Sequence, residues 1–167
     1  MKVINDAIHG QFNLDGVRAS LLETPEMNKL SHIKQLGLAH LVFPGAHHTR
    51  FEHSLGVSHI GGMMADSIGL DEHEKTLVEV AGMLHDVGHG PYSHTLEHIL
   101  HERGGLDHMS ITEGIILGEY DVLREGEESS VPNRRRIPDI LERNDIDPKD
   151  VAALIRGPDA RGTERTL

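Results

Sequence analysis

The stretch MLHDVGHGPYSH, Met83–His94, places three histidines and an aspartate beside two glycines and a proline. Its first two residues continue an apolar helical pattern, and Gly88, Gly90 and Pro91 favour an end to that helix. A buried core has little use for so many titratable side chains, because each needs hydrogen-bond partners or loses its charge. The stretch therefore predicts a functional site at the C-terminal end of a helix.

His85 and Asp86 are the strongest candidate metal ligands in this stretch. Adjacent residues point about 100° apart on an ideal helix, so both reach one metal only where the helix ends, as Gly88 allows. His53, on the preceding predicted helix, is the leading third ligand because consecutive helices usually pack as neighbours. Two imidazoles and one carboxylate suit Zn, Fe or Mn without distinguishing them. The chain has no cysteine, so thiolate sites are excluded.

Further basic side chains around this centre indicate a phosphorylated substrate. A metal lowers the pKa of bound water, and His89 or His94 can serve as general acid toward a leaving oxygen. The guanidinium of Arg50 can hold a phosphate bidentately. The pattern predicts hydrolysis of a phosphoester or a phosphoanhydride.

Each of these residues also has a structural interpretation. A histidine such as His85 suits the dipole at a helix C-terminus, His53 alone could be a packed residue, and Arg50 alone could be a surface ion-pair partner. The functional interpretation depends on the occurrence of these residues together in the two motifs. Several other histidines are interpreted as structural or solvated: His40, His47, His48, His59, His73, His98 and His101.

The rest of the chain predicts helices around one core, with a weak two-strand signal around Gly10. Phe51, Leu55, Ile60, Met63, Met64 and Ile68 are compatible with the core face of a glycine-containing helix, whose small residues favour close packing. The stretch 125–138 is expected to be a loop, with Arg134–Arg136 solvated. Helices are expected over residues 24–37, 51–70, 77–86, 93–103, 107–120 and 147–157, capped by residues such as Thr24 and Asp147.

The bulk composition predicts one cytoplasmic domain over residues 1–167. Sixteen basic against 27 acidic residues give a net charge of −11, which disfavours binding to long nucleic acid. We expect no membrane segment, because no run of 18 apolar residues and no signal peptide is found.

The motifs RFEHSLGV (50–57) and HDVGHGPYSH (85–94) together resemble the HD-domain metal-dependent phosphohydrolases, in particular the deoxynucleoside triphosphate triphosphohydrolase branch. KVINDAIHG, ETPEMNKLSHIKQLG and VFPGAHHTRFEHSLGV resemble the same branch, in the same order, from Lys2 to about Glu97. The resemblance implies an all-α HD fold, a small N-terminal β-hairpin aside, and a homo-oligomer.

The resemblance also implies a role for each site residue, within residues 35–108. His53, His85 and Asp86 would hold one divalent transition metal, with Mg²⁺ accompanying the nucleotide. The remaining roles fall to residues around the substrate: His89, His94 and His108 at the phosphates, Glu97 orienting a catalytic histidine, and Gln35 and Arg50 at the sugar hydroxyl and a phosphate.

The sequence departs from the family pattern at several points. The family has a second metal-ligating aspartate well downstream, and Leu167 precedes any such motif, so we expect the chain to be the N-terminal part of a longer protein or to take its fourth ligand from water or a partner. Met109 stands where the family usually has Glu. Glu23 and Ser31 replace the Asp and Arg that read an activating guanine, which argues against activation in that form.

The leading hypothesis is a dNTP triphosphohydrolase that releases deoxynucleoside and triphosphate. A second hypothesis keeps the metal centre but takes nucleoside monophosphates or short oligonucleotides as substrates. A third, motivated by the missing fourth ligand, is a non-catalytic interaction module with a vestigial site.

Overall fold

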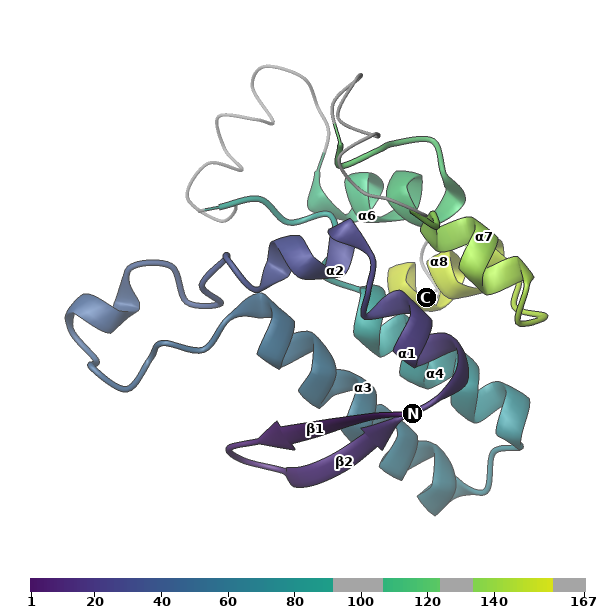
Figure 1. Ribbon diagram of the computed structural model, residues 1–167, viewed down its shortest axis with the longest axis horizontal. Helices are drawn as coiled ribbons and strands as arrows, with labels where there is room; N and C mark the ends of the chain where they lie inside the picture. Colours follow the sequence, from purple (N-terminus) through teal and green to yellow (C-terminus); the bar gives the residue numbers. More distant parts are fainter. Residues whose placement is uncertain (92–106, 124–133, 158–167) are drawn as a thin grey trace, which may run out of the picture.

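Two helices, α3 (Arg50–Ile68) and α4 (Glu72–Leu84), run antiparallel through the centre of the computed structural model (Figure 1). The structure describes residues 1–91, 107–123 and 134–157. Thr49 and Glu52 form a capping box at the start of α3, and Gly69 ends it in the left-handed region with φ 74°. Asp71 and Glu74 form a second capping box at the start of α4. Only a short connection separates the two helices, which sets them side by side.

Small residues allow α3 and α4 to approach closely. A Cβ atom added at Gly82 of α4 would lie 3.2 Å from the backbone N and Cα atoms of Ser58 in α3. One added at Gly61 would lie 3.1 Å from the Val78 side chain. The expected close packing by small residues is therefore confirmed, and it brings the N-terminal end of α3 beside the C-terminal end of α4.

The same packing overturns part of the predicted core face of α3. Leu55 is buried and Phe51 packs against the core, but the remaining predicted core residues of this helix are exposed: Ile60, Met63, Met64 and Ile68. The buried stripe of α3 consists instead mainly of small side chains, among them Ser54, Ser58, Gly62 and Ala65. The sequence prediction chose residues by hydrophobicity, whereas the close helix contact selects them by size.

The predicted N-terminal hairpin is present, as strands β1 (Lys2–Asp6) and β2 (Gly10–Leu14) in antiparallel register. Asp6 accepts hydrogen bonds from the backbone N–H groups of Ile8 and His9 in the turn. Phe12 stacks on His59 of α3 with ring centroids 4.4 Å apart, which attaches the hairpin to the central helix pair. Helix α1 (Gly16–Leu21), which the sequence did not predict, follows directly.

Helix α2 (Pro25–Leu30) begins at the predicted cap, Thr24, but ends well before Gly37. The chain turns there because it pairs with the segment that leads into α3. Ile33 O accepts from Arg50 N at 2.8 Å, and Gln35 N donates to His48 O at 3.1 Å. Residues 36–48, including the 3-10 helix η1 (Ala39–Leu41), form an arm that projects to the left in Figure 1.

Three helices complete the core on the other side of α4: α6 (His108–Leu117), α7 (Ile137–Glu142) and α8 (Pro148–Arg156). The predicted helices at 107–120 and 147–157 are thus confirmed, whereas α7 starts inside the predicted loop. The helix expected at 93–103 lies outside the described residues. The largest fully buried side chains come from both sides of α4 and include Leu14, Leu21, Met27, Leu30, Leu84, Ile116, Leu141 and Val151.

Arg134 corrects the expectation of a solvated arginine run. Its Nη2 atom lies 2.9 Å from Glu26 Oε1 and 2.7 Å from Asp121 Oδ1, and its side chain is only 10% exposed. Arg136 donates to the Gly118 carbonyl at the end of α6. Both side chains therefore connect elements of the fold. The described helices include none that is long and apolar enough to cross a membrane.

Replacing the cap of α4 tests its contribution to stability. In Asp71→Ala, the N–H groups of His73 and Glu74 lose their acceptor, and we expect a loss of about 1 kcal/mol in the free energy of unfolding, or about 2–4 °C in Tm. Asp71→Asn keeps a capping oxygen and should melt close to the native protein. Equal melting temperatures for Asp71→Ala and Asp71→Asn in calorimetry would contradict this role.

Candidate metal centre

Two histidines and an aspartate meet where α3 begins and α4 ends. His53 lies in the first turn of α3, and His85 is the C-cap residue of α4. Their Nε2 atoms are 3.2 Å apart, and His85 Nε2 is 3.4 Å from Asp86 Oδ1. One ligand atom from each residue lies within 4.8 Å of the other two. The structure thus brings together the three residues that the sequence predicted as metal ligands.

The imidazole of His85 is oriented by its own helix. His85 Nδ1 is 2.8 Å from the carbonyl oxygen of Gly82, which can only accept a hydrogen bond, so Nδ1 carries the proton. The Nε2 lone pair then points toward His53 and Asp86. A backbone carbonyl bound to the far nitrogen is the usual way in which a metal-ligating histidine is held.

Asp86 is held by Arg50 on one oxygen and faces the imidazoles with the other. Arg50 Nη1 donates to Asp86 Oδ2 at 2.8 Å, while Oδ1 lies 3.4 Å from both His85 Nε2 and His89 Nε2. Burial by itself would raise the pKa of Asp86, but the charges of His85 and Arg50 and the Arg50 hydrogen bond hold that pKa below its ordinary value. The carboxylate is therefore ionised and has one oxygen directed to the cluster.

His53 is favoured in its neutral form. Burial, followed by the neighbouring His85, lowers the pKa of His53 below its ordinary value of 6.5. Metal binding requires neutral imidazoles and ionised carboxylates. The donor set of His53, His85 and Asp86 therefore fits a divalent transition metal in chemistry as well as in spacing.

Residues 85–89, called here the ligand turn, follow α4 and are fixed from α6. Gly88 N donates to Thr112 Oγ1 at 3.0 Å, and a Cβ added at Gly88 would lie 2.5 Å from the carbonyl oxygen of His108. Gly88 was expected to favour the end of the preceding helix. In the structure its lack of a side chain also allows α6 to approach the ligand turn. Sequence reasoning did not select Thr112, although a threonine inside the apolar run ITEGIIL was a signal that a polar partner lay opposite.

The structure places some of the predicted substrate residues near this cluster. His89 is 4% exposed, lies beside Asp86 and stacks on His108 with ring centroids 4.3 Å apart, so one predicted phosphate-side histidine adjoins Asp86 and a second packs on the first. Gln35 Oε1 is buried and accepts no hydrogen bond from the described part of the chain. Two other predicted site residues, His94 and Glu97, lie outside the described residues. The roles of all these side chains stay predictions.

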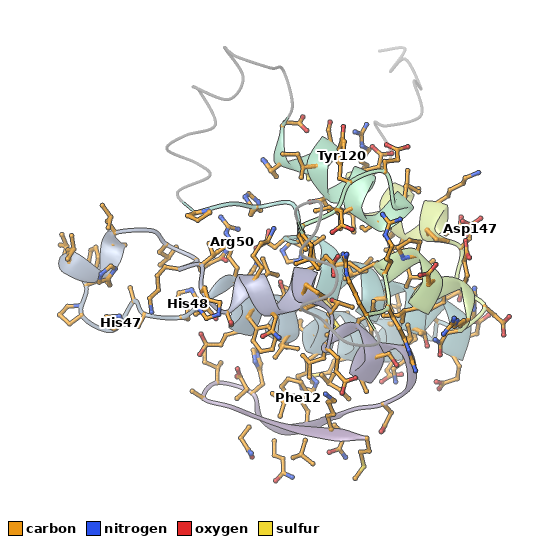
Figure 2. The ribbon with its side chains drawn as sticks, turned by 45° about the horizontal axis from the view of Figure 1, so that its top comes forward. Phe12, His47, His48, Arg50, Tyr120 and Asp147 are labelled. Atoms are coloured by element: carbon orange, nitrogen blue, oxygen red, sulfur yellow. The ribbon has the colours of Figure 1, made fainter. Side chains whose placement is uncertain are left out.

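The arm carries three of the histidines that were interpreted as structural or solvated, His40, His47 and His48. His47 lies out on the arm and His48 nearer its base, whereas Arg50 lies inward at the start of α3 (Figure 2). Both histidines are exposed, and Arg50 is 3% exposed. The phosphate role predicted for Arg50 therefore applies to a buried side chain that already holds Asp86.

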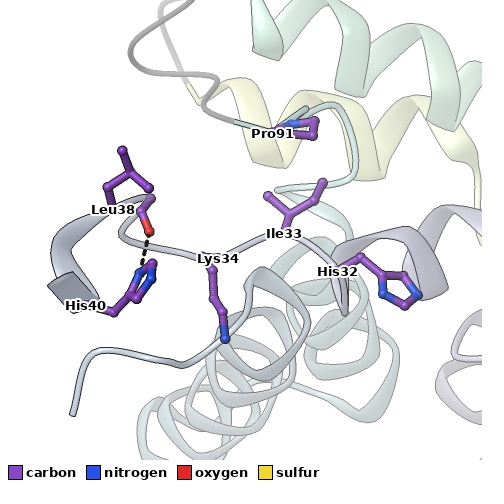
Figure 3. A pocket seen from close by; sticks show the side chains of 7 residues that line it. His32, Ile33, Lys34, Leu38, His40 and Pro91 are labelled. Carbon is purple, nitrogen blue, oxygen red and sulfur yellow. Dashed lines mark hydrogen bonds between the residues drawn. The ribbon is translucent and has the colours of Figure 1, made fainter. Parts of the chain in front are cut away.

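A pocket of about 110 Å³ lies between the base of the arm and the end of the ligand turn (Figure 3). Its lining combines apolar and basic side chains, and His40 Nδ1 donates to the carbonyl oxygen of Gly37 within it. The residues lining it are His32, Ile33, Lys34, Gly37, Leu38, His40 and Pro91.

The fold and the cluster define a helical domain with a His-His-Asp cluster that fits a metal ion, and comparison with known proteins gives its family. A family model described as "HD domain" matches residues 50–157, more than half of the chain. The chain belongs to the HD domain family, the phosphohydrolase family that its motifs resemble.

Relatives agree with this assignment. Human deoxynucleoside triphosphate triphosphohydrolase SAMHD1 is 44% identical over 104 residues, which cover 58% of this chain and 17% of the human protein. Uncharacterized protein MJ1154 of Methanocaldococcus jannaschii is 36% identical over 168 residues, covering 98% of this chain and 35% of that protein. A crystal structure of a hypothetical protein from Aquifex aeolicus matches with a TM-score of 0.70 at 38% identity, covering 93% of this chain and 36% of that one. The chain spans about a third or less of the length of these relatives.

Removing a ligand tests the metal centre directly. The native protein should bind Mn²⁺, and His85→Ala should weaken that binding by more than the ~10–100-fold that changes beyond the ligands themselves typically cause. His73→Ala removes an exposed imidazole at the start of α4 and should leave Mn²⁺ affinity unchanged. Titration calorimetry measures both, and equal affinities would show that the metal is not held by this cluster.

Adding a methyl group at Gly88 tests the fit of the ligand turn. Gly88→Ala forces its Cβ against Thr112 and the His108 carbonyl, and we expect a cost of about 1–3 kcal/mol in stability together with weaker Mn²⁺ binding. Gly90→Ala is the matched control, because a Cβ there meets no atom of the described residues within 4 Å. Chemical denaturation should separate the two variants, and equal stability would contradict the close approach of α6.

Proposed function

We propose that this chain provides the metal centre of a phosphohydrolase that converts a deoxynucleoside triphosphate into deoxynucleoside and triphosphate. The observation that carries the proposal is the convergence of His53, His85 and Asp86, with one atom from each within 4.8 Å of the others. That cluster lies in a chain similar to proteins named deoxynucleoside triphosphate triphosphohydrolase in human, Xenopus laevis and Danio rerio.

The reaction requires charge stabilisation at the phosphates and one proton at the leaving group. Hydrolysis breaks the bond between the 5′-oxygen and the α-phosphorus, joins the oxygen of water to that phosphorus, and returns a proton to the 5′-oxygen. A divalent metal held by the cluster supplies Lewis-acid polarisation and lowers the pKa of water. The protein side chains must hold the substrate and deliver the proton.

In this proposal, Arg50 and the stacked histidines perform these tasks. Arg50 orients Asp86 through Oδ2 and adds a permanent positive charge beside the phosphates. His89 and His108, stacked next to Asp86, are the described imidazoles proposed to donate the proton or hold phosphate oxygens. Because the net charge of the chain is −11, its overall field does not attract an anionic substrate, and any attraction must come from this local group of basic side chains.

Incubation of the full-length protein with Mn²⁺ or Mg²⁺ and each of the four common dNTPs tests the proposal. We expect deoxynucleoside and triphosphate as products, detected by chromatography. The double variant His85→Ala/Asp86→Ala should lose about 100-fold or more in rate, because Lewis-acid stabilisation is worth several kcal/mol. His73→Ala, far from the cluster, should retain the native rate.

The same assay distinguishes the alternatives. Product from nucleoside monophosphates or short oligonucleotides, but from no dNTP, would retain the metal centre and replace the substrate. A protein that binds Mn²⁺ and hydrolyses none of these substrates would contradict the proposed reaction. If the double variant also kept its bound metal and its cellular role, the interaction module would be the better description.

A further inference from the structure

Two side chains from different helices hydrogen-bond to the backbone of the ligand turn. Lys29, in the last turn of α2, donates from Nζ to the carbonyl oxygen of Val87 at 2.8 Å. Thr112 of α6 accepts from Gly88 N at 3.0 Å and donates to His85 O at 3.4 Å. The backbone is therefore held directly before and directly after Asp86.

The Lys29 bond is made by a largely buried ammonium group. Burial lowers the pKa of Lys29, and the negative charge of Glu26, one turn earlier in α2, opposes that shift. Glu26 is itself 3% exposed and paired with Arg134. Arg134 thus pairs with Glu26, the charge of Glu26 favours the ammonium form of Lys29, and Lys29 donates to a carbonyl oxygen of the ligand turn.

The threonine bond is equally enclosed. Thr112 is 1% exposed, and its single hydroxyl serves both a donor and an acceptor of the ligand turn. Its neighbour on α6, Ile116, is fully buried in the core. Because Ile116 anchors α6 in the core, the Thr112 hydroxyl holds the peptide groups around Asp86 at a defined position relative to the core.

We propose that Lys29 and Thr112 are positioning residues, which preorganise the ligand turn so that His85 and Asp86 face His53 before a metal binds. This inference rests on the metal centre in the proposed function, and it does not depend on the identity of the substrate. Groups that orient metal ligands cut the ordering cost of binding, and their loss typically lowers metal affinity by ~10–100-fold.

The decisive variants remove one hydrogen-bonding group and keep the shape. Thr112→Val replaces the hydroxyl with a methyl group, and Lys29→Met removes the ammonium and keeps an unbranched chain. Thr112→Ser and Lys29→Arg keep the hydrogen-bonding group and serve as rescue variants. Thr76→Val and Lys34→Met are matched controls, because Thr76 donates to Glu72 O on an exposed face and Lys34 donates to His47 O on the arm.

The measurements are the Kd for Mn²⁺ in the full-length protein, by titration calorimetry, and the Tm of the metal-free protein. We expect Thr112→Val and Lys29→Met to weaken Mn²⁺ binding by ~10–100-fold, as the loss of groups that orient metal ligands typically does. Thr112→Ser and Lys29→Arg should recover most of the affinity, and the two controls should match the native Kd. A purely structural role would lower Tm and leave the Kd of the folded protein unchanged.

Each result decides the proposal. Native Kd values in folded Thr112→Val and Lys29→Met would overturn it, as would equal losses in the two control variants. If Lys29→Met does not fold, the isosteric Thr112→Val and its serine counterpart decide alone. A native protein that binds Mn²⁺ but hydrolyses no dNTP would contradict only the proposed substrate, whereas one that binds no Mn²⁺ would remove the metal centre and this inference with it.

Discussion

The backbone contact between α3 and α4 is the constraint on which the metal centre depends. Gly82 of α4 faces the backbone of Ser58 in α3. A Cβ atom at position 82 would lie only 3.2 Å from the backbone N and Cα atoms of Ser58, so the helices meet too closely for a side chain there. His53 lies between one and two helical turns before Ser58, and His85 lies less than one turn after Gly82, so the separation of the helices sets the separation of the imidazoles. Larger residues at this crossing would move the helices apart and leave two histidines too distant to share one metal.

Electrostatics then determines which ion this geometry can hold. The cluster joins two imidazoles, of which that of His53 is favoured in its neutral form, to an ionised carboxylate, and the positive charge of Arg50 lies at the far oxygen of Asp86. The charge of His85, together with the charge and hydrogen bond of Arg50, opposes the effect of burial and lowers the pKa of Asp86. Arg50 makes its contribution through Oδ2 and leaves the other oxygen to the cluster, and an ionised carboxylate is the form that binds a metal.

The sequence was sufficient for the parts of this molecule that depend on local signals. Periodicity predicted α3, α4 and α6, although α4 begins at Glu72, before the expected start at residue 77, and a cap together with periodicity predicted α8. The motifs predicted which residues meet in the cluster. The helix expected to reach Gly37 ended at Leu30, because pairing of Ile33 and Gln35 with the segment before α3 replaced helical hydrogen bonds. That pairing depends on residues distant in sequence, so no local rule detects it.

The same distinction applies to the side chains around the cluster. Lys29 lies 58 residues from Val87, and Arg134 lies 108 residues from Glu26, so their contacts could not be inferred from spacing. Arg134 was expected in solvent because its neighbours are arginines and a proline-containing loop. In the structure, two carboxylates offset the cost of removing its charge from water, and only tertiary folding brings them there.

The position of the cluster at the C-terminal end of α4 has an electrostatic reason of its own. The last carbonyl groups of a helix lack intrahelical partners and carry partial negative charge, which favours a cation nearby. Here the carbonyl of Gly82 holds His85 Nδ1, so the helix end contributes to the imidazole that faces the metal position. Further carbonyl groups beyond the helix, those of His85 and Val87, are bonded by Thr112 and Lys29. The groups that terminate α4 are thus the groups that orient the ligand turn, and a substitution that changes how α4 ends necessarily changes the metal centre as well.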